Sequence, residues 1–309
     1  MFGAVVMAAL IVVTMLACDN NTGPSTQPPT DPHHFVNGIC TNPGCYMIQA
    51  VQIPAGTLTR DDYTLTLSAF RMFRFPVTQE LFYAVMERNP SHFHGGEGRE
   101  AYGTEEQGRR PVETVTWFDA VEFANKLSER EGLTPVYTIS EIERHEEGHI
   151  TAATVSANWN ANGFRLPTEA EWEYANRAVA ATPGGDAEWT WHFGVYPYDA
   201  GELGYYAWFN AGAGNLGHAY GMTREVGQKR PNAWGLHDTH GNVWEWVWDW
   251  IGTFPAASAT NPRGPDAGSD RVIRGGSSFS VAANTHSAIR DGLTPDNRNS
   301  ALGFRLVRP

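Results

Sequence analysis

Residues 241–250, GNVWEWVWDW, constrain the fold more than any other part of this chain. Tryptophan occupies every second position from Trp244 to Trp250. Side chains of a β-strand point alternately to its two faces, so this spacing places four indoles on one face. Each indole buries a large apolar area when packed. The pattern therefore favours a strand whose indole face packs in the core over an aromatic platform that binds sugars.

Three helices are predicted from N-terminal capping residues. Thr78 and Thr116 each precede apolar residues at helical spacing, and a threonine at this position caps free backbone amides. Thr168 is followed three residues later by Glu171, which is the pattern of a capping box. The buried faces are expected to include Phe82 and Met86 in the first helix, Trp117, Ala120, Val121, Ala124 and Leu127 in the second, and Trp172, Ala175 and Ala178 in the third.

The rest of the chain favours irregular connections. Residues 63–75, YTLTLSAFRMFRF, begin with alternating apolar residues and are expected to form a strand. The 309 residues include 32 glycines and 19 prolines, and 41% are hydrophobic. With no internal repeat and no second linker, these features predict one α+β domain with much irregular structure.

The charge of the chain argues against two classes of partner. The formal net charge is −12, and no run of lysine or arginine is present. A nucleic-acid-binding protein would carry a basic patch, and an anionic membrane surface would repel this chain. Contact with a membrane is therefore expected only through an anchor.

The N-terminus has the features of an export signal. Residues 3–17 are almost entirely apolar and too few to span a bilayer. The ending Leu16-Ala17-Cys18 resembles a bacterial lipoprotein signal. Residues 1–17 are thus interpreted as a signal peptide and Cys18 as the lipidated residue, with an ordinary cleaved signal as the alternative. Lipidation would place the protein in the bacterial cell envelope, at its outer surface.

Residues 18–37 follow as a polar tether rich in Asn, Thr, Pro and Ser, which cannot bury an apolar core. Two further cysteines, Cys40 and Cys45, lie close together after it. An exported compartment permits a disulfide between them, but the spacing does not decide between a disulfide and two thiols. The pair is a poor signal for zinc.

Five motifs occur in a fixed order through the remaining residues, 38–309. They are FPVTQELF (75–82), RPVETVTWFDAVEFANKLS (110–128), GFRLPTEAEWEYANRA (163–178), WGLHDTHGNVWEWVWDW (234–250) and the pair RGGS (274–277) with LGFR (302–305). This order resembles the formylglycine-generating-enzyme, or sulfatase-modifying-factor, family. The resemblance implies a C-type-lectin fold with little regular structure.

The resemblance also implies that the enzyme's chemistry is missing. In the enzymes a redox-active cysteine pair lies between RGGS and LGFR, and the two positions fall on Ser280 and Thr285. Neither side chain can act as a thiolate nucleophile or as a soft copper ligand. No catalytic cofactor is therefore expected.

The segment of about residues 278–300 mixes small, apolar, aromatic and charged residues between framework-like ones. This mixture resembles the variable protein of a diversity-generating retroelement, most closely the spirochaete lipoprotein of that group. Twelve residues are expected to contact a ligand: Ser278, Phe279, Ser280, Val281, Asn284, His286, Ile289, Asp291, Gly292, Leu293, Asn299 and Ser300. Six of them, Phe279, Val281, His286, Ile289, Asp291 and Leu293, should be accessible on one face, with Trp244, Trp246 and Arg305 buried beside it. The alternative is an ordinary irregular loop.

A calcium ion is also implied by the resemblance. The matching ligands would be Asp238, the carbonyls of Gly241 and Val243, and Glu245, and oxygen ligands suit a hard cation. The alternative is a loop carboxylate that accepts hydrogen bonds from backbone amides.

Histidines and arginines offer weaker candidates. Close pairs occur at His33 and His34, His92 and His94, His145 and His149, and His237 and His240, but none comes with both a glutamate and a third ligand in an HExxH arrangement. These are expected to be solvated loop residues. Arg165, Arg274 and Arg305 could clamp an anion, but a structural ion pair or a bracket of carbonyl groups is favoured.

Together these features predict a surface-displayed, monomeric lipoprotein that binds a macromolecular ligand, protein or glycan, and catalyses nothing. The first alternative is a divergent formylglycine-generating-type oxidase or accessory factor with relocated catalytic groups. The second is a structural envelope protein.

Overall fold

The structure is a computed structural model that describes residues 35–36, 39–40, 48–60, 63–96, 98–178, 191–193, 200–253 and 258–309. The predicted signal peptide, Cys18, Cys45 and almost all of the tether lie outside these residues, so the lipidation and disulfide predictions are not addressed by it. Among the described residues, none of the helices is both long and apolar enough to cross a membrane.

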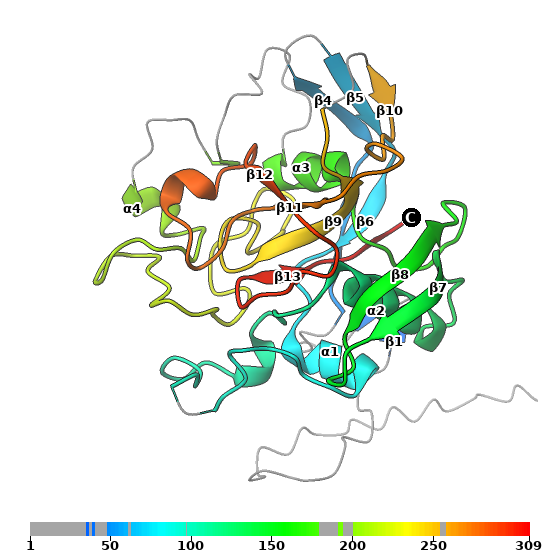
Figure 1. Cartoon of the computed structure of the whole chain (residues 1–309). Coiled ribbons are helices and arrows are strands. Elements are labelled where there is room, and N and C mark those ends of the chain that lie inside the picture. Colours follow the sequence, from blue (N-terminus) through cyan, green and yellow to red (C-terminus); the bar gives the residue numbers. More distant parts are fainter. Residues whose placement is uncertain are drawn as a thin grey trace, which may run out of the picture.

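The tryptophan-rich segment forms β9 (Trp244–Trp250), an inner strand of the four-stranded sheet in the middle of the molecule (Figure 1). It pairs antiparallel with β11 (Arg271–Arg274) and parallel with β13 (Leu302–Phe304). β12 (Arg290–Leu293) completes the sheet on the other side of β11. The segment between β11 and β13, which contains residues 278–300, is therefore joined at both of its ends to strands of the central sheet.

Hydrophobic clusters cover both faces of this sheet, as the alternation of side chains requires. Trp246 packs with helices α1 (Gln79–Met86) and α2 (Trp117–Arg130), and its indole nitrogen donates to the carbonyl of Val115 at 3.1 Å. The neighbouring Val247 packs on the opposite face with α3 (Glu169–Arg177). The prediction that the indole face packs in the core is confirmed at Trp246, which is completely buried.

The remaining elements surround this sheet. They are β1 (Phe35–Val36) with β2 (Ile39–Cys40); β3 (Ala50–Ile53) with β6 (Phe70–Phe73) and β14 (Val307–Arg308); β4 (Gly56–Arg60) with β5 (Tyr63–Leu67) and β10 (Ala259–Thr260); β7 (Tyr137–Arg144) with β8 (Ile150–Ala157); and the short helices η1 (Gln107–Arg109), α4 (Ala200–Leu203) and η2 (Ala282–Asn284). Among the described residues, short strands in five sheets joined by long connections confirm the predicted α+β fold with much irregular structure.

The predicted caps are present. Thr78 accepts a hydrogen bond from the amide of Leu81, and it precedes α1. Thr116 forms a capping box with Asp119, and Thr168 forms the predicted one with Glu171. Each box satisfies amides that have no partner within the helix, so these helix starts are encoded locally.

The prediction of one strand over residues 63–75 was wrong. The segment forms two strands, β5 and β6, which belong to different sheets. Between them, the amide of Ser68 donates to the side-chain oxygen of Asn261 at 2.9 Å, and the Asn261 amide donates back to the Ser68 hydroxyl at 3.0 Å. A distant residue thus fixes the break between the two strands.

Helix α3 is buried along its whole length, not only on the predicted apolar face. Its three glutamates each pair with an arginine: Glu169 with Arg290 at 2.7 Å, Glu171 with Arg165 at 2.6 Å, and Glu173 with Arg274 at 2.6 Å. Buried charges are tolerated when they are paired and hydrogen-bonded. The favoured structural role of Arg165 and Arg274 is confirmed.

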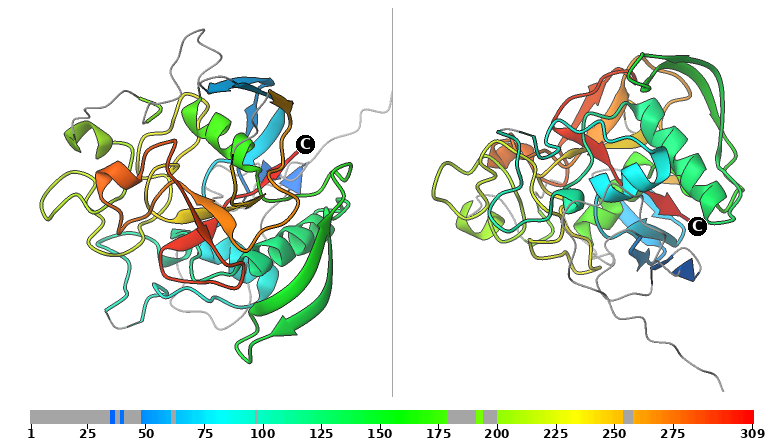
Figure 2. Two further views of the ribbon diagram at one scale, coloured as in Figure 1. Left: turned by 45° about the horizontal axis from the view of Figure 1, so that its top comes forward. Right: turned by 90° about the horizontal axis from the view of Figure 1, so that it is seen from below.

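The β7–β8 hairpin is an element that the sequence analysis did not predict. It extends along α2 on the outside of the molecule (Figure 2). Most of its side chains are partly or fully exposed, but Tyr137 and Ile150 pack into the same cluster as α2. With so few apolar residues facing the core, the hairpin carries a weak hydrophobic pattern.

Candidate ligand-binding surface

The segment between β11 and β13 is held by a buried arginine. Arg274 donates hydrogen bonds to three consecutive backbone carbonyls of this segment, those of Ser287 at 2.9 Å, Ala288 at 3.1 Å and Ile289 at 2.6 Å. The same guanidinium is paired with Glu173 of α3. The path of the backbone here is therefore imposed by a side chain from the central sheet.

Thr285 anchors the middle of the segment. Its hydroxyl accepts a hydrogen bond from the indole of Trp191 at 3.2 Å, and its carbonyl lies 2.7 Å from Nδ1 of His240. A carbonyl only accepts, so His240 Nδ1 carries the proton and its Nε2 accepts from His192 Nδ1, 2.9 Å away. Two side chains from outside the segment, those of Trp191 and His240, thus fix this residue, and His192 holds His240 in turn.

Burial determines the protonation of this histidine pair. It lowers the pKa of His192 to about 3 and that of His240 well below its usual value. Both rings are neutral at pH 7. The expectation of solvated loop histidines is wrong for His240, which is completely buried because the tertiary fold packs it under the segment. It is also wrong for His149, which is 6% exposed.

Seven of the twelve predicted ligand-contacting residues line one groove of about 480 Å³: Phe279, Ser280, Val281, Asn284, Asp291, Leu293 and Asn299. Trp244 and Ile273 of the central sheet also line it. Phe279 and Val281 are apolar, yet 45% and 53% of their surfaces are exposed. Exposed apolar side chains gathered at a groove are typical of an interaction surface.

The other predicted residues lie elsewhere. Ser278 is 1% exposed because its backbone is tied down by the carbonyl of Asn242, so it is removed from the candidate set. His286, Ile289 and Gly292 are half-buried and do not line the groove, and Ser300 lines the neighbouring cleft.

Of the three residues that were predicted to lie buried beside the groove, two are buried. Trp246 and Arg305 are buried as expected. Trp244 is only half-buried, because it lies near the end of β9 where the groove opens. Its indole is therefore part of the candidate binding surface and is not only one of the buried residues that support it.

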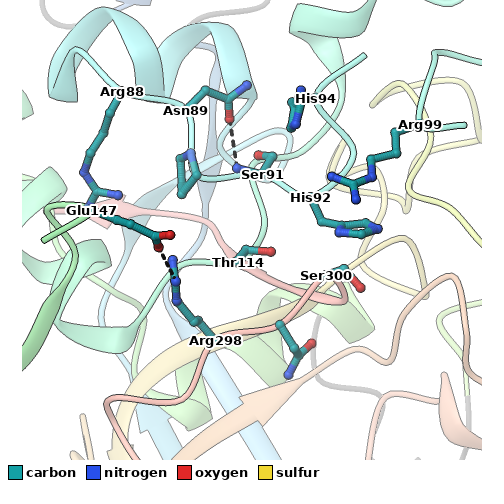
Figure 3. A pocket seen from close by; sticks show the side chains of 12 residues that line it. Arg88, Asn89, Ser91, His92, His94, Arg99, Thr114, Glu147, Arg298 and Ser300 are labelled. Atoms are coloured by element: carbon teal, nitrogen blue, oxygen red, sulfur yellow. Dashed lines mark hydrogen bonds and ion pairs between the residues drawn. The ribbon is translucent and has the colours of Figure 1, made fainter. Parts of the chain in front are cut away.

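A second hollow, a cleft of about 570 Å³, adjoins the groove and shares Asn299 with it. Its lining is polar and largely basic, as Figure 3 shows: Arg88, Asn89, Pro90, Ser91, His92, His94, Arg99, Thr114, Glu147, Arg298, Asn299 and Ser300. Arg88 pairs with Asp119 and Arg298 with Glu147, whereas Arg99 forms no ion pair with any residue that the structure describes. Sequence reasoning missed this cleft because its residues come from four separate segments.

Backbone strain marks the boundary between the two hollows. Thr114 has a φ of 61°, which is unfavourable for a β-branched residue, and its amide donates to the carbonyl of Asn299 at 3.0 Å. Glu113 beside it accepts hydrogen bonds from the amides of His92 and Phe93. These bonds hold residues 92–93 and 113–114 against the segment between β11 and β13. Backbone strain of this kind is concentrated at functional sites.

The two positions that match the enzyme's cysteines are occupied by hydroxyl groups with structural partners. The Ser280 hydroxyl accepts from the amide of Ser277 at 3.0 Å. Thr285 is buried, and its hydroxyl also donates to the carbonyl of Ala282 at 2.8 Å. These groups shape the backbone and supply neither a thiolate nor a soft metal ligand.

The implied calcium ligands do not fit the ion. Both carboxylate oxygens of Glu245 accept hydrogen bonds from Arg305, at 2.6 and 2.7 Å, and one also accepts from the indole of Trp172. Calcium at this carboxylate would have to compete with a buried guanidinium. Asp238 instead accepts from the amide of Gly227 at 2.7 Å, which is the alternative arrangement considered for this loop. The geometry of this loop therefore favours that alternative over the prediction of calcium at Asp238, Gly241, Val243 and Glu245.

Known proteins resemble this chain over most of its length. It is 35% identical over 265 residues to the chaperone protein LppX of Paenibacillus barcinonensis, which covers 80% of this chain and 82% of that protein. It is 40% identical over 170 residues to the formylglycine-generating enzyme of Streptomyces coelicolor, but those residues are 50% of this chain and only 49% of the enzyme. The solved structure of Treponema denticola variable protein 1 superposes with a TM-score of 0.70 at 35% identity, covering 91% of this chain and 100% of that one.

The similarity to a spirochaete variable protein agrees with the resemblance seen in the sequence motifs. Residues 37–309 also match the sulfatase-modifying factor enzyme 1-like domain, a stretch that contains all five motifs. Fold, motifs and comparisons therefore agree that this chain belongs to the family of the sulfatase-modifying factor enzyme 1-like domain.

Proposed function

We propose that this protein is a ligand-binding lipoprotein of the bacterial envelope, that it binds a protein or glycan at the groove, and that it catalyses no reaction. The observation that carries the proposal is the position of Phe279, Val281 and Asp291, whose exposed side chains lie on a segment with a buried, externally fixed backbone. Such a surface can change its side chains while its shape stays constant.

The energetics of the groove support this role. Arg274, His240 and Trp191 already hold the backbone of this segment in one conformation. The backbone therefore loses little conformational entropy when a ligand binds, which lowers the free-energy cost of binding. The similarity to Treponema denticola variable protein 1 supports the further proposal that residues 278–300 are diversified by a retroelement. We restrict the ligand-contacting set to the exposed and half-buried residues, without Ser278.

Two other functions are weighed against this one. A divergent oxidase is disfavoured because Ser280 and Thr285 stand where the enzymes use cysteines, and both hydroxyls have structural partners. A structural envelope protein would have to cover Phe279 and Val281 through contacts between copies. We propose a monomer, whose exposed groove is available to another molecule.

The proposal is tested with two libraries displayed on yeast, each built on residues 38–309. The first randomises Phe279, Val281, Asn284, Asp291 and Asn299. The matched control randomises five exposed residues outside the groove: Tyr83, Ile142, Tyr205, Leu216 and Tyr220. Both libraries should keep folded display, but only the groove library should yield specific binders to a panel of purified proteins and glycans. Equal yields from both libraries would refute the groove as the binding surface.

The anchor is tested separately. Cys18→Ser should move the full-length protein, expressed in its bacterial host, from the detergent phase to the aqueous phase, because acyl chains supply the membrane affinity. Unchanged partition would place the anchor elsewhere. Accessibility of the anchored protein to protease on intact cells reports whether it reaches the outer surface.

A further inference from the structure

The turn of the β7–β8 hairpin brings together two imidazoles and a carboxylate. One ligand atom from each of His145, Glu147 and His149 lies within 4.8 Å of the others. The turn is closed by backbone hydrogen bonds from His145 to His149 at 3.0 Å and from Gly148 to His145 at 2.8 Å. The two imidazole rings therefore face each other, with their centroids 4.6 Å apart.

His149 adds a second, independent observation. It is only 6% exposed, and its Nδ1 is buried without a hydrogen-bond partner among the residues that the structure describes. That nitrogen lies 3.9 Å from Oε2 of Glu147, and Nδ1 of His145 lies 3.8 Å from the same oxygen. An unsatisfied buried polar atom costs free energy, and a bound ion at this position would remove that cost.

We propose that His145, Glu147 and His149 form a binding site for a divalent transition-metal ion of the zinc class. Two imidazoles and one carboxylate suit such an ion, whereas calcium prefers oxygen ligands alone. Three protein ligands leave a coordination position open for water or for a group of a bound molecule.

Arg298 competes with the ion for Glu147. Its guanidinium lies 2.6 Å from the Glu147 carboxylate, and both residues line the basic cleft (Figure 3). A solvent-exposed pair of this kind is weak, so a metal can displace the arginine. The exchange would release the Arg298 guanidinium into the cleft and add the charge of the ion at its edge. Metal binding would thereby make the cleft beside the groove more positive.

The site is tested by titrating metal-free protein with Zn²⁺ in a calorimeter. His145→Ala and His149→Ala should each weaken binding by at least about tenfold, as loss of a ligand or of its support does. Glu147→Gln should also weaken it. Arg298→Ala should strengthen it, because the competing cation is gone. The matched control is the double variant His92→Ala/His94→Ala, which removes an exposed histidine pair near the same cleft.

Circular dichroism of each metal-free variant establishes that it is folded before titration. The control pair should bind Zn²⁺ as the wild type does. Zinc affinity that is unchanged in His149→Ala, or that falls equally in the control pair, overturns the site, because binding would then be a general property of surface histidines. Affinity that does not rise in Arg298→Ala overturns the competition with Arg298.

Discussion

Arg274 and Glu173 form an ion pair with 2.6 Å between Nη2 and Oε2, and both side chains are completely or almost completely buried. The pair joins β11 to α3 at the same point where Arg274 holds three carbonyls of the C-terminal segment. One guanidinium thus connects the core to the candidate binding surface. The shape of that surface depends on a residue that no ligand would touch.

Replacing Arg274 with methionine should destabilise the protein by about 3–5 kcal/mol, because three carbonyls lose their donor and the buried Glu173 carboxylate loses one arginine partner while it keeps Arg177. Urea unfolding of the purified domain measures the change. Arg298→Met, at the exposed pair with Glu147, is the matched control and should unfold at nearly the same urea concentration as the wild type. Equal effects of the two substitutions would contradict the structural role of Arg274.

The exposed residues of the groove should tolerate substitution better than the buried residues beneath them. Phe279→Ser and Val281→Ser should each change the unfolding free energy by no more than about 0.5 kcal/mol, because about half of each residue is exposed at the surface. Trp246→Ala should cost about 3–5 kcal/mol, since it empties a packed site. Denaturant unfolding of the three variants measures these free energies. A large loss of unfolding free energy in either serine variant would show that the groove residues are part of the core.

The His192–His240 pair should make the fold sensitive to acid. Burial holds the pKa of both rings below the ordinary 6.5, so the folded state resists protonation. Above pH 6.5 both folded and unfolded chains carry neutral rings, and stability does not change through this pair. Below pH 6.5 the unfolded chain binds protons that the folded one does not, and stability falls by up to about 1.4 kcal/mol per pH unit for each ring.

This effect is isolated by comparing the wild type with His240→Gln, whose amide can still donate to the Thr285 carbonyl. Melting temperatures measured from pH 7 to pH 5 should fall more steeply in the wild type. Glu113, Asp238 and Asp249, whose pKa values are raised by burial, act in the opposite direction but equally in both proteins. Parallel curves would show that His240 does not resist protonation.

A calcium chelator should leave the melting temperature unchanged, because Arg305 and Trp172 already occupy the Glu245 carboxylate. Glu245→Gln should lower the melting temperature with or without chelator, since it breaks a buried ion pair. Scanning fluorimetry with EGTA makes the measurement. A chelator effect that disappears in Asp238→Ala would restore the calcium site.

No formylglycine should form when the protein is incubated with a cysteine-containing sulfatase peptide, copper and reductant. Ser280 and Thr285 supply no thiolate to bind the metal or the substrate. Mass spectrometry of the peptide detects the change, and the formylglycine-generating enzyme of Streptomyces coelicolor serves as the positive control. Turnover above the level without protein would favour the oxidase alternative.

Some features of the fold follow from the sequence because their causes are local. A threonine that caps a helix acts on amides two or three residues away, which is why Thr78, Thr116 and Thr168 marked three helices correctly. The alternation from Trp244 to Trp250 likewise specifies a strand and its two faces. That neither residue 280 nor residue 285 is a cysteine is likewise visible in the sequence itself.

Other features depend on residues that are far apart in the chain, and only the tertiary structure decides them. The sequence could not show that Ser278 is buried whereas Phe279 beside it is exposed, because irregular backbone has no fixed period. Nor could it pair Glu245 with Arg305, 60 residues away. The cleft around Arg99 and Arg298 arises in the same way, since long-range packing alone brings its segments together.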